Sequence, residues 1–258
     1  MAMAMAMAIA ITSFATAAGS VAAEAPSLVL TIDDGPSLRP TPLLTPAERN
    51  AALLSALALH EVSAALFVTV NFGADRPEGL ALARAWGAAG HRLGNHTMTH
   101  LDLDARNVSL AQYQQEVLDC DAVIQHLPGY RKWFRYTYLH EGASDYKREG
   151  MRAFLQSSGC INVAVGLDTR DWAFDPLLEA ALNRDPQADL VPLKKAYLDQ
   201  VWKQAQDSQQ KLREQGRSAV VVLVHHNLTN ALWLGDLLAM FKAKGWRFVS
   251  PELAVAQR

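Results

Sequence analysis

Seven short apolar runs recur along the chain, and helical patterns lie between most of them. The runs cover residues 28–32, 64–70, 91–94, 132–135, 161–165, 219–224 and 246–249. Apolar runs without polar alternation are typical of strands that are covered on both faces. Repeated strand–helix alternation predicts a parallel sheet with helices outside, either a barrel or a doubly wound open sheet. A length of 258 residues fits one such domain, because α/β barrels often run to about 250 residues undivided.

Capping and stop residues place the helices between these runs. Thr45 with Glu48, and Ser109 with Gln112, have the spacing of a capping box. We expect helices after Thr45, from Pro77 to Gly90, from Ser109 to before Pro128, and over 144–158, 192–215 and 229–244. Residues 167–193 have no clean pattern and are expected to cross the mouth of a site.

Polar side chains follow five of the predicted strands. They are Asp33 and Asp34, His96 and His100, Arg135, Asp168 and Asp171, and His225 and His226. In barrels and open α/β sheets the functional site lies at the carboxyl ends of the strands. These residues are therefore the candidates for one shared site.

Asp33 and Asp34 end the first apolar run, just before Gly35-Pro36. Consecutive strand residues point in opposite directions, so both carboxylates reach one site only if the backbone bends, and Gly-Pro favours a bend. Two unpaired carboxylates at a buried strand end repel each other. A metal ion, or a division into one ligand and one base, removes this problem; the alternative is a loop cap.

His96 and His100 are four residues apart. On a helical turn they would share a face and could bind one ion. Together with a strand-end carboxylate they would leave coordination positions open for water. The alternative is a pair of surface histidines.

The remaining candidates also have structural alternatives. Arg135 needs a carboxylate partner if it is buried, and could serve in a structural ion pair. Asp171 and Trp172 could belong to a solvated loop anchored by the Trp. His225, at a strand end, could donate a proton near neutral pH or be a core histidine.

Together, these segments resemble the polysaccharide deacetylase family, the NodB-homology domain of carbohydrate esterase family 4. The resemblance spans about residues 27–251, and five motifs occur in the family's order. They are Thr31-Ile32-Asp33-Asp34-Gly35-Pro36, His96-Thr97-Met98-Thr99-His100, Arg135-Tyr136-Thr137-Tyr138, Asp168-Thr169-Arg170-Asp171-Trp172 and Leu223-Val224-His225. Thr137 stands where the family carries Pro, and we expect this departure to loosen the backbone before Tyr138.

The resemblance implies a distorted (β/α)7 barrel and a role for each matching residue. Asp34, His96 and His100 would bind a divalent metal, usually zinc; Asp33 would be the general base, held ionised by Arg135; the backbone N–H of Tyr138 would stabilise the oxyanion; His225 would be the general acid, oriented by Asp171; and Trp172 and Leu223 would line a pocket for the acetyl methyl.

The implied reaction is removal of N-acetyl groups from an N-acetylglucosamine-containing polysaccharide, such as peptidoglycan, a chitin-like polymer or poly-N-acetylglucosamine. Alternatives are an O-acetyl esterase acting on acetylated polysaccharide, and a non-catalytic glycan-binding domain of the same fold.

The rest of the sequence bears on location and partners. Residues 1–23 carry no charged side chain and resemble a signal peptide, which predicts export to the periplasm or cell envelope and a catalytic domain over 24–258. No later stretch is apolar enough to span a bilayer. The net charge of −2 and the lack of a basic stripe do not favour nucleic acid as a partner. Cys120 and Cys160 could form one disulfide or remain free.

Overall fold

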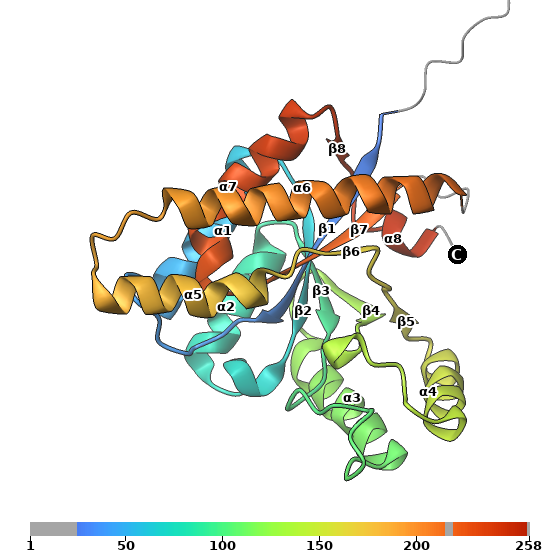
Figure 1. The fold of residues 1–258 in the computed structure, drawn as a ribbon. Coiled ribbons are helices and arrows are strands. Elements are labelled where there is room, and N and C mark those ends of the chain that lie inside the picture. Colours follow the sequence, from blue (N-terminus) through green and yellow to red (C-terminus); the bar gives the residue numbers. More distant parts are fainter. Residues whose placement is uncertain (1–24, 215–218, 257–258) are drawn as a thin grey trace, which may run out of the picture.

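A curled sheet of parallel strands forms the centre of the molecule, and helices surround it (Figure 1). The computed structural model describes residues 25–214 and 219–256, so the predicted signal peptide lies outside the described residues. The strand order is β5-β4-β3-β2-β1-β7-β6, and β8 pairs with β1. This curled half-barrel confirms the predicted α/β class and matches a distorted (β/α)7 barrel.

The elements follow the alternation that the sequence predicts. The strands are β1 (Ser27–Gly35), β2 (Ala64–Val68), β3 (Arg92–Asn95), β4 (Tyr130–Phe134), β5 (Ile161–Asn162), β6 (Leu167–Asp168), β7 (Ala219–His225) and β8 (Arg247–Phe248). The α-helices are α1 (Pro46–Leu59), α2 (Pro77–Ala88), α3 (Leu110–Ile124), α4 (Asp145–Ser158), α5 (Asp171–Arg184), α6 (Val191–Glu214), α7 (Leu228–Ala243) and α8 (Leu253–Ala256), and the short 3-10 helices are η1 (Val70–Phe72) and η2 (Thr137–Leu139). Both predicted capping boxes form, at Thr45 and Ser109.

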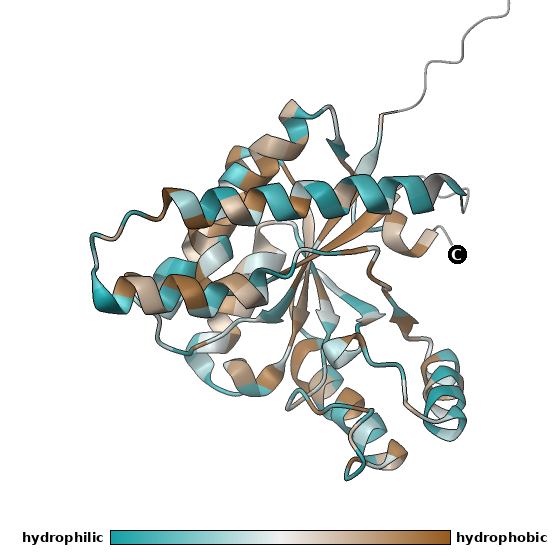
Figure 2. Cartoon of the chain, viewed as in Figure 1, coloured by the Kyte–Doolittle hydropathy of each residue, from teal (hydrophilic) through white to brown (hydrophobic). Residues whose placement is uncertain are grey.

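β1 is buried on both faces, which explains its unbroken apolar run. Leu28, Leu30 and Ile32 belong to the large core shared with the helices, while Val29 packs with Phe67 on the other side of the sheet. Figure 2 shows apolar residues along the central strands and hydrophilic residues over much of α6. β1 is therefore packed on both faces, and this packing also fixes the position of the two carboxylates at its end.

The segment 167–193 is more regular than predicted. It contains β6 and α5, whereas no regular element was expected there. The single strand predicted over 161–165 is replaced by two short strands, β5 and β6. β6 has two residues, too few to give a periodic pattern. α5 starts without a side-chain cap and contains Pro176, so the usual helix signals are missing.

Two further expectations concern cysteines and membranes. Cys120 and Cys160 are both buried and free. Within residues 25–214 and 219–256, no helix combines the length and the hydropathy that a bilayer crossing requires.

Candidate active site

The bend that brings Asp33 and Asp34 to one site lies within β1 itself. The β1–β2 register shifts between Ile32 and Gly35, and Asp34 has a φ of 66°. Aspartate tolerates this left-handed region better than most residues. Asp33 is 1% exposed and is the register partner of His225 on β7. One strand end thus places two carboxylates, with different surroundings, beside an imidazole.

His96 and His100 lie in the loop after β3, which corrects the predicted helical turn. Thr97 and His100 have φ values of 72° and 63°, so the loop reverses where a helix would continue. Nε2 of His100 lies 3.2 Å from Oδ1 of Asp34, and Nε2 of His96 lies 3.5 Å from the same oxygen. The three side chains therefore converge although they come from separate segments of the chain.

This cluster has the donor set and spacing of a metal site. Ligand atoms bound at 2.0–2.2 Å in a tetrahedron lie about 3.3–3.6 Å apart, close to the separations from Asp34. Nδ1 of His96 donates to the carbonyl of Arg135 at 2.9 Å, because a carbonyl can only accept, so Nε2 carries a lone pair.

Nε2 of His96 and Oδ1 of Asp34 therefore face each other in the cluster, and each carries a lone pair. Oδ1 of Asp34 is buried, and no group of the described chain donates a hydrogen bond to it with good geometry. Burial lowers the pKa of His96, which keeps its ring neutral. Burial disfavours a charged Asp34, yet the nearby imidazoles of His100, His225 and His96 outweigh this effect and hold the pKa of Asp34 well below its usual range. A carboxylate and a neutral imidazole that share no proton fit a divalent cation.

Arg135 is buried against Asp33. Its Nη1 donates to Oδ1 of Asp33 at 3.1 Å and to Thr31 at 3.0 Å, and its Nε donates to the carbonyl of Val163 at 2.8 Å. The guanidinium also lies over the Phe67 ring, 4.4 Å from its centroid. The pair keeps Asp33 next to the cluster, since Oδ2 of Asp33 is 3.7 Å from Nε2 of His96.

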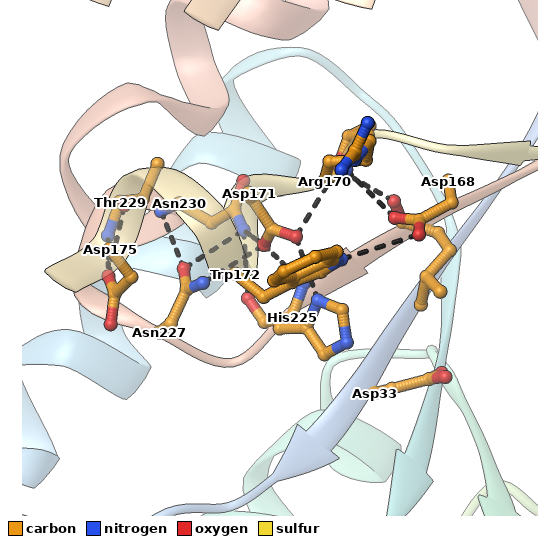
Figure 3. Close-up of polar contacts among 12 residues, drawn as sticks. Asp33, Asp168, Arg170, Asp171, Trp172, Asp175, His225, Asn227, Thr229 and Asn230 are labelled. Carbon is orange, nitrogen blue, oxygen red and sulfur yellow. Dashed lines mark hydrogen bonds and ion pairs between the residues drawn. The ribbon is translucent and has the colours of Figure 1, made fainter. Parts of the chain in front are cut away.

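Asp171 and His225 form a second buried pair. Oδ1 of Asp171 accepts from Nδ1 of His225 at 2.7 Å, and Oδ2 accepts from the backbone N–H of His225 at 2.7 Å. Burial alone would lower the pKa of His225, but the charge and hydrogen bond of Asp171 outweigh it and raise that pKa to about 10. Figure 3 shows Asp171 on one side of the His225 ring and Asp33 on the other. His225 is thus protonated at neutral pH and faces the carboxylates of β1.

Two asparagines complete this pair, and sequence reasoning missed both. Nδ2 of Asn227 donates to Oδ2 of Asp171 at 3.0 Å, and Nδ2 of Asn230 donates to the same oxygen. Burial would raise the pKa of Asp171, but His225 and the hydrogen bond from Asn230 hold it below its usual range. The position of the two asparagines directly after a strand end was the available signal. His226 differs from its neighbour: it is buried, bonded to Asn50 at 3.0 Å, and burial lowers its pKa to about 3.

Thr137 is held firmly, contrary to the expected loosening. Its backbone N–H donates to the Tyr113 oxygen at 3.2 Å, its hydroxyl oxygen lies 2.9 Å from that same oxygen, and its hydroxyl donates to the carbonyl of Leu101. Tyr138 follows with a φ of 56°. No acceptor among the described residues takes a hydrogen bond from the N–H of Tyr138, so this donor remains available.

A groove of about 1010 Å³ joins these groups. Its lining includes both carboxylates of β1, the two clustered imidazoles and His225, together with Tyr138, Trp172 and Leu223. Trp172 is 49% exposed, and its indole N–H donates to Asp168 at 3.3 Å, whereas Leu223 is almost fully buried. The described structure thus places the sequence-predicted site residues at the lining of one groove at the carboxyl end of the sheet, except Arg135 and Asp171, which are buried behind it against Asp33 and His225.

Such a groove, in a curled parallel sheet with a cluster able to hold a metal, defines a hydrolase-like α/β barrel. The family model for polysaccharide deacetylases matches residues 20–154, just over half of the chain. The chain therefore belongs to the polysaccharide deacetylase family. The match contains the first three motifs but not Asp171 or His225, whose assignment depends on the geometry described above.

One relative and two solved structures illustrate the similarity. A chitooligosaccharide deacetylase from Sinorhizobium fredii (strain NBRC 101917 / NGR234) is 40% identical over 101 residues, which cover 39% of this chain and 40% of that protein. A peptidoglycan deacetylase structure from Bacillus subtilis has a TM-score of 0.58 at 21% identity, covering 90% of this chain and 91% of the other. A family 4 pseudoenzyme from Bacillus anthracis has a TM-score of 0.63 at 17% identity, covering 90% and 66%. The two structures establish the fold only, and the fold occurs in a pseudoenzyme too.

Proposed function

We propose that this protein is a metal-dependent hydrolase that removes N-acetyl groups from an N-acetylglucosamine-containing polysaccharide. The observation that carries the proposal is the meeting of a carboxylate–imidazole cluster, an Arg-paired carboxylate and an Asp-paired imidazole in one groove. The chitooligosaccharide deacetylase relative supports the substrate class. A groove of about 1010 Å³ is also at the upper end of typical ligand sites, of about 300–1000 Å³, which suits an oligosaccharide.

Each proposed role follows from a position in the groove. Asp34, His96 and His100 would hold a divalent ion such as zinc, which when bound supplies Lewis acidity and makes water a nucleophile at neutral pH. Asp33 takes a proton from the attacking water, and Arg135 pairs with this carboxylate and holds it in place.

The acid side of the reaction falls to His225. As the carbon–nitrogen bond breaks, Nε2 of His225 gives its proton to the leaving nitrogen, and Asp171 stabilises the protonated ring until then. The N–H of Tyr138 donates to the oxygen that becomes negative during attack. The products are acetate and a free amine, so the atoms balance with one water consumed. Trp172 and Leu223 provide an apolar wall for the acetyl methyl.

The raised pKa of His225 favours an amide over an ester as the substrate. An amine must be protonated to leave, whereas the alcohol of an ester leaves more readily. A pair that keeps imidazolium at neutral pH therefore serves amide hydrolysis best.

Acetate release from N-acetylglucosamine oligomers by the zinc-loaded protein tests the proposal. Asp33→Asn should lower kcat by about 10²–10⁴-fold, the usual contribution of a general base, while zinc stoichiometry stays the same. Unchanged acetate release in this variant would refute the assignment. Faster release from acetylated xylan would favour the esterase, and oligomer binding without acetate release would favour a glycan-binding module.

We also propose export from the cytoplasm, on the basis of the uncharged, apolar residues 1–23. Fractionation of cells that express the full chain should place the protein in the periplasm or medium with Glu24 as its first residue. Full-length protein in the cytoplasm would contradict this.

A further inference from the structure

Tyr113 and Thr137 form a buried hydrogen-bond network beside the groove, and both residues are fully buried. The hydroxyl of Thr137 donates to the carbonyl of Leu101, because a carbonyl has no proton to give. The shared proton between the two hydroxyls, 2.9 Å apart, must therefore come from Tyr113. The Tyr113 oxygen in turn accepts from the backbone N–H of Thr137 at 3.2 Å. Every donor in the network has one assigned acceptor.

This network joins the two loops on which the proposed site depends. Leu101 directly follows the candidate ligand His100, and Thr137 directly precedes Tyr138. Tyr113 projects from α3, so a helix anchors both loops at once. The carbonyl of Thr137 is fixed as well, because it accepts from the N–H of His140 at 3.1 Å.

The peptide plane between Thr137 and Tyr138 determines where the N–H of Tyr138 points. Tyr138 has φ 56° and ψ 7°, a conformation that an aromatic residue keeps only when its surroundings impose it. The bonds to the N–H, the hydroxyl and the carbonyl of Thr137 are those surroundings. They leave the N–H of Tyr138 unpaired within the described chain and fixed in direction.

We infer that Tyr113 and Thr137 are positioning residues that aim the N–H of Tyr138 at the developing oxyanion, an inference that rests on the proposed function. The Tyr113 hydroxyl fixes this peptide through hydrogen bonds, whereas a proline at position 137 would fix it through its ring. A proline at position 137 has no N–H and could not donate to Tyr113. The hydroxyl of Tyr113 and the N–H of Thr137 are therefore both needed for this hydrogen bond.

Tyr113→Phe is the direct test, because it keeps the ring that packs near Phe134 and Tyr136 and removes only the hydroxyl. Losing one oxyanion donor costs about 10²–10³-fold in kcat, and misdirecting it should cost less, about 10–100-fold. KM for the oligomer and zinc stoichiometry should stay the same, which a general loss of structure would not allow. Tyr146→Phe is the matched control, because this exposed tyrosine of α4 lies outside the groove and its loss of a hydroxyl should leave kcat unchanged.

A rescue variant separates positioning from mere packing. Thr137→Pro combined with Tyr113→Phe should recover much of the lost kcat, because the ring fixes φ and removes the N–H that has lost its acceptor. Tyr136 has a ψ of 131°, which a residue before proline adopts readily. A double variant no faster than Tyr113→Phe alone would overturn the inference, as would a Tyr113→Phe variant with unchanged kcat. In either case, acetate release by the parent protein would leave the proposed function intact.

Amide hydrogen exchange at His140, measured by NMR, decides the inference even if the parent protein releases no acetate, because the N–H of His140 donates to the carbonyl of Thr137. Its exchange rate should rise about tenfold or more in Tyr113→Phe, because local opening at this peptide becomes easier, and should return toward the parent value in the double variant. Equal rates in the parent protein and Tyr113→Phe would show that the network does not hold this peptide.

Discussion

Asp34, His100 and Tyr138 share a left-handed backbone, with φ values of 66°, 63° and 56°. Each such residue costs of order 1–3 kcal/mol unless its surroundings require it, and all three line the groove. These strained backbone positions therefore lie where the side chains of Asp34 and His100 and the N–H of Tyr138 must point into the groove. The sequence does not predict a left-handed backbone at these three positions, because none of them is a glycine.

Loss of either candidate imidazole should abolish tight metal binding. In His96→Ala or His100→Ala, only two of the three ligands remain, so we expect zinc affinity to fall by at least about 10²-fold, the upper end of what even outer-shell changes cost. Calorimetric titration of each variant measures this. His126→Ala, an exposed histidine on no cluster, is the control and should bind zinc as the parent does. Stoichiometric zinc in both cluster variants would refute the ligand assignment.

Asp171→Asn should move the alkaline limb of the pH–rate profile to lower pH. With Asp171 charged, the pKa of His225 is raised to about 10, so the acid form persists through neutral pH and is lost only as the pH climbs toward that value. Without this charge, burial dominates and the pKa of His225 falls, so the acid is lost earlier. Acetate release measured across pH 6–11 would reveal the shift.

Asp175→Asn is the matched control for this pH profile. Asp175 is another buried carboxylate of α5, but it accepts from Thr229 rather than from His225. The alkaline limb of the pH–rate profile of Asp175→Asn should coincide with that of the parent protein. The same limb in Asp171→Asn and in the parent would exclude His225 as the acid.

At the scale of elements, α1 holds the loop that follows β1. Arg49 of α1 is buried and donates to the carbonyl of Arg39 at 3.0 Å, to Thr41 at 3.2 Å, and to the carbonyl of Ser37. Arg49→Met would leave these partly buried acceptors without their donor, at about 1 kcal/mol for each, the lower end of the cost of an unsatisfied group. We expect unfolding free energy to fall by about 3 kcal/mol, measured by urea denaturation.

The exposed Arg84 on α2 gives the comparison for this loss. Arg84→Met should change the unfolding free energy by less than about 0.5 kcal/mol, as is usual at surface positions. An equally small change in Arg49→Met would mean that the loop does not depend on α1.

Elements with local signals could be predicted, and elements fixed by distant partners could not. The helices after Thr45 and Ser109 are marked by their own capping residues. β6 exists because its two residues pair with β7, about fifty positions further along the chain. Likewise, His96 and His100 were recognisable as a pair, but their loop geometry depends on β2 and on Glu116 of α3, which bond the loop backbone. The residues of the site could therefore be predicted from the sequence, but their arrangement in space could not.

At the scale of the whole molecule, the cluster of Asp34, His96 and His100 brings β1 next to the loop after β3. Asp34 is more than sixty residues from His96 in the sequence, so an ion bound by both would link distant parts of the sheet. Ligands that converge only in the folded chain bind the ion in the native state alone. At a zinc concentration 100 times Kd, such binding adds about 2.7 kcal/mol. For a domain of this size that corresponds to a rise in Tm of roughly 5–10 °C.

Thermal unfolding with and without metal tests this linkage without any assay of activity. Zinc should raise the Tm of the chelator-treated protein, and the rise should shrink as the pH falls, because metal ligands must be deprotonated to bind. Calcium at the same concentration should do little, because it prefers all-oxygen sites with six to eight ligands. His96→Ala should remove the response to zinc. A rise of equal size in His96→Ala would place the ion elsewhere, and no rise in the parent protein would mean that Asp34, His96 and His100 hold no ion that stabilises the fold.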